Sequence, residues 1–318
     1  MQKSLVKQSM SNVIVSIVTR IIVMLLPFVV RTVIIRILGI LYVGVDSLFS
    51  SLLNMLSLSE LGFSSAIVYA MYKPIAEGDD KKVAALLSFY KNVYRIVGAV
   101  ILAVGLILLP NIKWFIAEGT EYPSNINLYI IYLILLVNTT ASYFFFAYKN
   151  SLLIASMRND IDSLIDMGRS ILSHVGQIIL LLIFKNYYFY IALLPIITIS
   201  NDLVRNVIIN KRYPQYLDSS IKLTKSEKKD IMSRVGALIG HKLGGFVFTS
   251  VDSIIISAFL GLITLGRYSN YYAIFAAVYA MESTVYTANC IYIYSIGKSS
   301  QSNYCTYWCW INSSFRIG

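Results

Sequence analysis

Charged residues are scarce in this chain of 318 residues: Asp, Glu, Lys and Arg make up 14% of it, whereas hydrophobic residues make up 57%. A soluble domain has about 25% charged and about 45–50% apolar residues. The composition therefore excludes an ordinary soluble protein. It predicts an all-α polytopic membrane protein, because apolar runs of membrane length cross a bilayer as helices.

Histidine and cysteine are also rare. The two histidines, His174 and His241, are too few and too far apart to indicate a metal site. The three cysteines, Cys290, Cys305 and Cys309, contain one Cys-x-x-x-Cys spacing without a further pair, which is a weak signal for a metal or a disulfide. The chain has no Gly-rich phosphate loop, His-Glu-x-x-His or Gly-x-Ser-x-Gly pattern. We predict no cofactor, no metal and no enzymatic activity.

Basic residues outnumber acidic ones, which gives a formal net charge of +11. The cations are not gathered in a soluble basic domain with interleaved aromatic residues, so the sequence predicts no nucleic-acid partner. They lie in loops and inside apolar runs instead. This distribution is typical of residues that orient a membrane protein and that hold an anionic ligand within it.

The apolar runs predict eight membrane-spanning helices, since a span needs about 20 predominantly apolar residues. The predicted spans cover residues 13–35, 41–69, 93–109, 126–147, 161–184, 188–209, 231–260 and 268–288. Basic loops alternate with non-basic ones: the loop after the second span holds Lys73, Lys81 and Lys82, whereas the loop at 110–125 has Lys113 against two glutamates. This alternation predicts a cytoplasmic N-terminus.

One segment occurs twice. Residues 38–47 (LGILYVGVDS) return as residues 260–269 (LGLITLGRYS), with Leu, both Gly and Ser in register at an offset of 222 (39 to 261 and 44 to 266). Six predicted spans separate the copies, so both should share one orientation in the membrane, as in a parallel repeat.

The repeat predicts two lobes, of which the second is incomplete. We expect a six-helix lobe at 1–210, a basic cytoplasmic linker at 211–230, the first two helices of a second lobe at 231–288, and an atypical tail at 289–318. Either the tail is a genuine short end, or the reading frame is shifted or the chain cut short near residue 288.

Polar residues recur at helical spacing within four of the predicted spans. An ionisable side chain inside a bilayer usually faces a cavity or a partner, so these polar faces should meet around a hydrated cavity. The faces comprise Ser9, Asn12, Ser16, Arg20, Pro27 and Arg31; Asp46, Ser50, Asn54, Ser57, Glu60 and Ser64; Asp162, Asp166, Arg169, Ser173 and Gln177; and Arg234, His241, Gly245 and Asp252.

Each polar residue also has a structural interpretation. Arg36, Arg158, Arg234 and Lys242 can lie at an interface and extend toward water. Asp162 and Asp166 can neutralise Arg169 from the same helix. Gly236, Gly240 and Gly244 form two Gly-x-x-x-Gly spacings, which predict a close approach of another helix.

Several segments resemble the bacterial polysaccharide-export flippases of the Wzx type, within the multidrug/oligosaccharidyl-lipid/polysaccharide exporter superfamily. The similarity extends from the N-terminus to about Thr287. The segments that carry it are 31–39 (RTVIIRILG), 58–63 (LSELGF), 241–245 (HKLGG), 252–259 (DSIIISAF) and 266–271 (GRYSNY).

The resemblance implies a transporter of the bacterial inner membrane that moves an undecaprenyl-diphosphate-linked oligosaccharide repeat unit by alternating access. The expected partners are this lipid-linked substrate, membrane lipids, a proton or sodium ion, and a polysaccharide polymerase. On this basis Arg20, Arg31, Asp46, Asn54 and Arg169 are candidate substrate-binding residues. His241 and Asp252 are candidates for ion coupling, because His titrates near neutral pH and a buried Asp can be tuned toward it.

Other functions stay open at this stage. An exporter of small cationic drugs would need acidic cavity walls, and Arg20 and Arg31 argue against it. A polysaccharide polymerase or glycosyltransferase would need a large extracytoplasmic loop, and the segment at 110–125 is short for that role. The remaining alternative is an inactive fragment of a flippase.

Overall fold

The computed structural model describes residues 23–57, 63–119, 122–123, 125–156, 158–217 and 222–295. These residues form helices and contain no strand, which confirms the predicted all-α class. After a helical segment at 23–37, the elements are α2 (Ile40–Leu56), α3 (Phe63–Glu77), α4 (Asp80–Leu108), η2 (Leu109–Phe115), α5 (Leu128–Phe144), η3 (Ala147–Lys149), α6 (Asn150–Ala155), α7 (Asn159–Phe184), α8 (Tyr187–Arg212), η4 (Pro214–Tyr216) and α9 (Lys225–Ser295).

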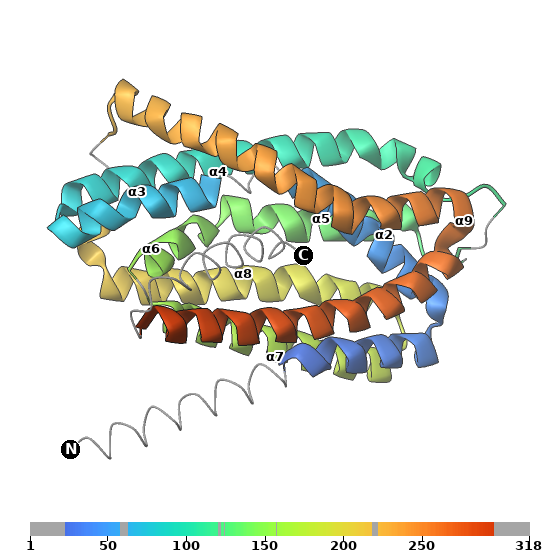
Figure 1. Ribbon diagram of the computed structural model, residues 1–318. Helices are drawn as coiled ribbons and strands as arrows, with labels where there is room; N and C mark the ends of the chain where they lie inside the picture. The colour runs from blue at the N-terminus through green and yellow to red at the C-terminus, as the bar shows by residue number, and fades with distance from the viewer. Residues whose placement is uncertain are drawn as a thin grey trace, which may run out of the picture.

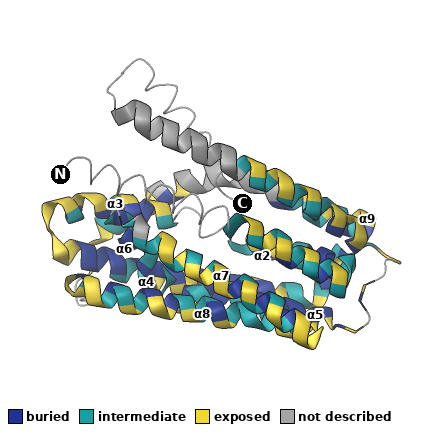
Figure 2. Cartoon of the chain, turned by 90° about the horizontal axis from the view of Figure 1, so that it is seen from below, coloured by how far each residue is buried: buried dark blue, intermediate teal, exposed yellow. Residues whose placement is uncertain are grey.

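The long helices are apolar enough for a bilayer. Within the described ranges, four helical stretches pass as candidate spans, and a fifth forms if α5 crosses together with the segment Ala147–Ala155, from which it is bent by 51°. Figure 2 shows exposed positions along the outer sides of α7 and α8, where apolar side chains such as Leu172 and Ile196 lie 61% exposed. Apolar outer faces on long helices are those of a membrane protein.

Several predicted boundaries were wrong. The predicted span at 41–69 corresponds to two helices, α2 and α3, and the predicted loop that followed it is largely helical. Lys73 lies in α3, and Lys82 lies in the first turn of α4, where its backbone N–H donates to the Asp79 side chain at 3.0 Å. α4 has 29 residues. Its length of about 44 Å exceeds the roughly 30 Å of a hydrocarbon core, so it extends beyond the apolar part that hydropathy detects.

Glycine reverses the chain at the equivalent position of each repeat copy. Gly39 has φ 108° and ψ 168°, and Gly261 has φ 81° and ψ 173°. Such positive φ values favour glycine, because a Cβ would clash with the backbone. Figure 1 shows both reversals, the one before α2 and the one within α9, at the same end of the bundle. α9 is therefore two helical arms, and the apolar stretch Ser250–Tyr279 belongs to both of them.

The two repeat copies also pack against each other reciprocally. A methyl group on Gly44 would lie 2.1 Å from the carbonyl oxygen of Leu262, and one on Gly266 would lie 2.7 Å from that of Ile40. Ile40 and Leu262 are equivalent in the repeat, as are Gly44 and Gly266, so the contact is close to two-fold symmetric. The structure thus shows a close helix approach here. In the predicted Gly-x-x-x-Gly run, a Cβ on Gly236 would meet nothing within 4 Å. The surroundings of Gly240 and Gly244 lie outside the described set, so the close approach there stays a prediction.

The segment at 211–230, which was expected to link the two lobes, is partly helical. α8 continues to Arg212 and α9 begins at Lys225, inside the segment expected as a linker. Thr224 and Glu227 cap the start of α9: the Thr224 N–H donates to Glu227 Oε2 at 2.9 Å, and the Glu227 N–H donates to Thr224 Oγ1 at 3.3 Å. This capping box satisfies two of the backbone donors at the helix start. Glu227 also pairs with Lys82 of α4 at 3.0 Å.

Candidate functional site: a polar cavity between the helices

A cavity of about 710 Å³ opens between the first helical segment, α2, α5, α7, α8 and the second arm of α9. Its wall is polar over much of its area although it lies inside an apolar bundle. The polar members are Arg31, Asp46, Ser50, Asn54, Asn138, Thr139, Arg169, Ser170, Ser173, His174, Gln177 and Tyr190. The second arm of α9 contributes small apolar residues, Ala273, Ala276 and Ala277.

α7 supplies the largest share of the polar wall because its polar residues follow the helical period. Arg169, Ser173 and Gln177 are four residues apart, and Ser170 and His174 repeat that spacing one position later. Side chains at i, i+4 and i+8 lie along the same face of a helix. Three of the four polar faces expected from the sequence therefore meet in this cavity, those of the first helix, α2 and α7.

Arg31 links the first helical segment to the second repeat copy. Its Nη1 donates to the backbone carbonyl of Ser269 in α9 at 2.5 Å. Asp46 of α2 lines the same cavity and interacts electrostatically with Arg31, and the nearby Tyr187 hydroxyl donates to the Tyr42 backbone carbonyl of α2 at 3.4 Å. Arg31 and Asp46 are both half-buried, which fits side chains that face a hydrated space within a bundle.

Four of the five predicted substrate-binding residues line this cavity: Arg31, Asp46, Asn54 and Arg169. Arg20 lies outside the described residues. The structure thus brings the described candidates together from the first helical segment, the adjacent α2 and the distant α7. Their role in binding stays a prediction.

The predicted ion-coupling pair is not part of the described cavity wall. Asp252 is exposed on the first arm of α9, and its Oδ2 accepts a hydrogen bond from the Tyr268 hydroxyl at 3.1 Å. His241 belongs to the same helical arm, and its side chain lies outside the described set. Ion coupling at these residues remains a prediction.

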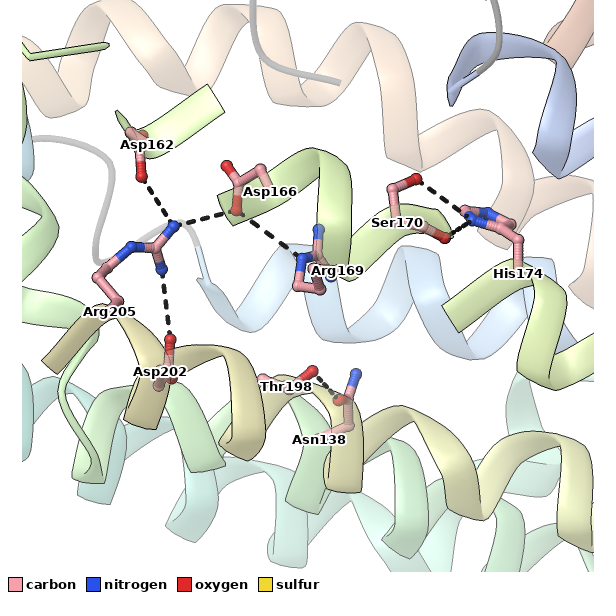
Figure 3. Close-up of polar contacts among 9 residues, drawn as sticks. All are labelled: Asn138, Asp162, Asp166, Arg169, Ser170, His174, Thr198, Asp202 and Arg205. Carbon is pink, nitrogen blue, oxygen red and sulfur yellow. Dashed lines mark hydrogen bonds and ion pairs between the residues drawn. The ribbon is translucent and has the colours of Figure 1, made fainter. Parts of the chain in front are cut away.

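A cluster of opposite charges lies beside the cavity, between α7 and α8 (Figure 3). Arg205 Nη2 contacts Asp162 Oδ1 at 2.8 Å and Asp166 Oδ1 at 3.0 Å, and Nη1 contacts Asp202 Oδ1 at 3.4 Å. Asp166 also faces Arg169 Nε at 3.9 Å. The expected partner of both α7 aspartates was Arg169, but the main one is Arg205, whose side chain is only 7% exposed.

Sequence reasoning overlooked three features of this region. His174 lines the cavity, and its spacing from Ser170 was the signal that could have revealed it. Asn138 lines the cavity and accepts a hydrogen bond from the Thr198 hydroxyl at 2.8 Å. Lys149, just after the predicted span at 126–147, is buried and donates to the side chains of Asn206 and Asn210. These contacts join α5, η3 and α8, which sequence spacing alone does not bring together.

The fold and the cavity define an all-α, multi-pass membrane protein with a charged interior. The chain belongs to the polysaccharide biosynthesis protein family, whose model matches residues 9–288. No curated protein and no solved structure matches the chain. The family match places the protein in polysaccharide biosynthesis at a membrane, and it ends close to Thr287, where the resemblance noted above also ends.

Proposed function

We propose that this protein is a Wzx-type flippase, which moves a diphosphate-linked oligosaccharide on a polyprenyl carrier across the bacterial inner membrane by alternating access. The observation that carries the proposal is the cavity, where Arg31 and Arg169 lie among amide and hydroxyl side chains within an apolar bundle. Family membership in polysaccharide biosynthesis supports the substrate class.

The chemistry of the wall suits such a substrate. Guanidinium groups bind phosphate oxygens by paired, charge-assisted hydrogen bonds, which assigns the diphosphate to Arg31 and Arg169. Asn54, Ser50 and Asn138 offer hydrogen bonds to sugar hydroxyls. The polyprenyl tail is apolar and can remain in the lipid, so the cavity has to shelter only the polar head group.

The contact between the repeat copies suggests how substrate binding and movement are linked. The Arg31 guanidinium donates a hydrogen bond to the Ser269 carbonyl in the second arm of α9. A diphosphate that binds the Arg31 guanidinium in place of the Ser269 carbonyl removes this hydrogen bond. Binding then favours a different arrangement of the first helical segment and the second arm of α9. A ligand shifts a conformational equilibrium only if it binds one arrangement more tightly than the other.

A flipping assay tests the proposal. Vesicles containing the full chain receive a fluorescent prenyl-diphosphate oligosaccharide, and outer-leaflet exposure is followed over time. We expect transport of the chemically unchanged lipid. Arg31→Gln and Arg169→Gln should each slow transport roughly 10- to 100-fold, the scale of one lost charged hydrogen bond.

Arg36→Gln is the matched control, because Arg36 lies on the same helix as Arg31 but is exposed and absent from the cavity wall. It should transport at the wild-type rate. No transport by the folded wild-type chain, or equal losses in Arg36→Gln and Arg31→Gln, would overturn the proposal. Chemical conversion of the lipid during the assay would instead favour a membrane enzyme of polysaccharide assembly.

Three finer statements belong to the same proposal. The N-terminus is cytoplasmic, because basic segments alternate along the chain. A proton or sodium ion drives transport, with Asp252 and His241 as candidate residues. A polysaccharide polymerase receives the transported unit on the outer face.

A further inference from the structure

His174 occupies a special position among the polar residues of the cavity. It projects from α7 into the wall that also holds Arg31, Asp46 and Arg169. It is half-buried, so its imidazole is in contact with the cavity and shielded from bulk solvent. Histidine is the side chain that ordinarily changes charge between about pH 5 and pH 8.

The hydrogen bonds of His174 define which nitrogen is free. Nδ1 lies 2.6 Å from the backbone carbonyl oxygen of Ser170 and 3.3 Å from Ser170 Oγ (Figure 3). A carbonyl oxygen can only accept, so Nδ1 carries the proton that it donates to Ser170. Nε2 has no hydrogen-bond partner among the described residues. It accepts in the neutral ring and donates once it is protonated.

The proposed ligand is an anion, and the described cavity wall already holds cations. Arg31 and Arg169 lie in this lining together with the carboxyl group of Asp46. A diphosphate esterified at both ends carries two negative charges, and it lacks the second ionisation near pH 6 that a phosphate monoester has. Protonation of His174 adds a further cation beside the two arginines, and this cation can pair with the diphosphate.

We infer that His174 is a ligand-binding residue that takes up a proton when a diphosphate diester enters the cavity, with Nε2–H donating to a phosphate oxygen. The inference rests on the proposed function and adds a residue and a pH dependence to it. Ligand binding and protonation then strengthen each other reciprocally, so affinity rises as the pH falls.

Other ionisable groups also lie around the described cavity. The first helix contributes Arg31 and α7 contributes Arg169; arginine remains charged throughout the neutral range. α8 contributes Tyr190, and a phenol stays neutral in this range. α5 and α9 contribute uncharged residues. The acidic groups are Asp46 of α2, which lines the cavity, and Asp166 of α7, which pairs with Arg169. Asp46→Asn in the titration described next separates the contribution of this carboxyl group from that of His174.

Binding of a defined probe to the purified full chain tests the inference. The probe is a C15 prenyl diphosphate bearing one N-acetylglucosamine, which does not itself titrate near neutral pH. Its Kd is measured by calorimetry at pH 8, 7, 6 and 5.5. For wild type we expect Kd to fall about tenfold from pH 8 to pH 5.5, within the usual range of coupling between two sites.

Two variants of His174 make the result specific. His174→Gln, which cannot take up a proton, should gain less than about twofold in affinity from pH 8 to pH 5.5. His174→Lys, which is permanently charged at these pH values, should bind tightly at both. His241→Gln replaces the other histidine of the chain and tests whether that ion-coupling candidate is the source of the pH dependence instead. Thermal unfolding of each variant at pH 8 verifies folding.

The outcomes separate the inference from the proposed function. A wild-type Kd that does not change with pH, or an unchanged dependence in His174→Gln, overturns the role of His174 and leaves the flippase proposal intact. Loss of the pH dependence in His241→Gln also overturns the role of His174, and it favours the pair His241 and Asp252 as its source. A folded wild-type chain that does not bind the probe at any pH overturns both.

Discussion

Arg205 and Arg31 are two inward-facing arginines with opposite surroundings. Arg205 is almost fully buried and contacts the carboxylates of Asp162, Asp166 and Asp202. Arg31 lines an open cavity, and the hydrogen bond that it makes is to a backbone carbonyl. The first guanidinium is committed to its neighbours, whereas the second retains donors for a ligand.

The difference shows how to separate structural charges from functional ones inside a membrane protein. Both arginines are equally unusual in an apolar helix, and insertion into the membrane is costly for each. Only their partners distinguish them. A buried arginine that is surrounded by carboxylates stabilises the fold. An arginine at a hydrated cavity wall with unused hydrogen-bond donors is available for binding.

The largest effect should come from Arg205→Met. This change leaves three carboxylates without their shared cation, of which the Asp202 side chain is only 4% exposed. Loss of one partner of a buried ion pair costs about 3–5 kcal/mol. We expect a strongly lowered thermal unfolding midpoint in detergent at pH 7.

Arg31→Met provides the other side of this comparison. It removes one hydrogen bond at a hydrated wall, so its cost to stability should be about 1.5 kcal/mol or less. Its main effect should be weaker binding of the diphosphate probe. Equal unfolding midpoints for Arg205→Met and Arg31→Met would contradict the structural difference between the two arginines.

A smaller loss of stability than that of Arg205→Met is expected where α2 and α9 cross. Gly44→Ala places a methyl group 2.1 Å from a backbone oxygen, so the helices must separate, and we expect a loss of about 1–3 kcal/mol. The separation should also weaken the bond from Arg31 to Ser269, three residues beyond Gly266. Unfolding and probe binding are both measured.

Gly168→Ala is the matched control for this crossing. Gly168 lies within α7, and a methyl group there would meet nothing within 4 Å. The same substitution should then stabilise the helix by up to about 1 kcal/mol. A Gly44→Ala variant as stable as Gly168→Ala would refute the close crossing of the repeat copies.

The smallest effect concerns Glu227, whose pair with Lys82 is neither buried nor at the cavity. The Thr224 backbone N–H, followed by Lys82, lowers the pKa of Glu227 to about 2. The ionised form therefore stabilises the fold above the ordinary Glu pKa of about 4.3, and this contribution is lost as the pH falls toward 2.

Glu227→Gln isolates this charge, because Gln preserves the capping hydrogen bond. At pH 7 the variant should lose less than about 1 kcal/mol, since both side chains of the pair are more than a third exposed. The difference between variant and wild type should shrink between pH 4.5 and pH 3 in thermal unfolding scans. A difference that grows on acidification would contradict the assigned pKa shift.

Much of the fold followed from local patterns. Hydropathy located α7 and α8 within a few residues of their observed ends, because both are long and apolar. It placed the start of α4 too late, because residues 80–92 form a helix of mixed polarity outside the apolar part. The repeat identified Gly39 and Gly261, but the close contacts of Gly44 with Leu262 and of Gly266 with Ile40 were not part of that prediction.

The candidate site was predicted in part. Helical spacing placed Arg31, Asp46 and Arg169 on polar faces, and the structure gathers those faces around one cavity. Spacing within one helix reveals which residues share a face, but it carries no information about the neighbouring helix. This is why Arg205 was overlooked as the partner of Asp162, which lies 43 residues away.

The sequence by itself determined the helical class, the duplicated glycine turns and the residues that face inward, because periodicity and backbone freedom are local properties. Only the tertiary structure decided which inward charges neutralise one another and which remain open to a ligand. That choice depends on distances between side chains from separate helices. The interior therefore contains an ion-paired cluster around Arg205 and a cavity in which Arg31 keeps hydrogen-bond donors available for a ligand.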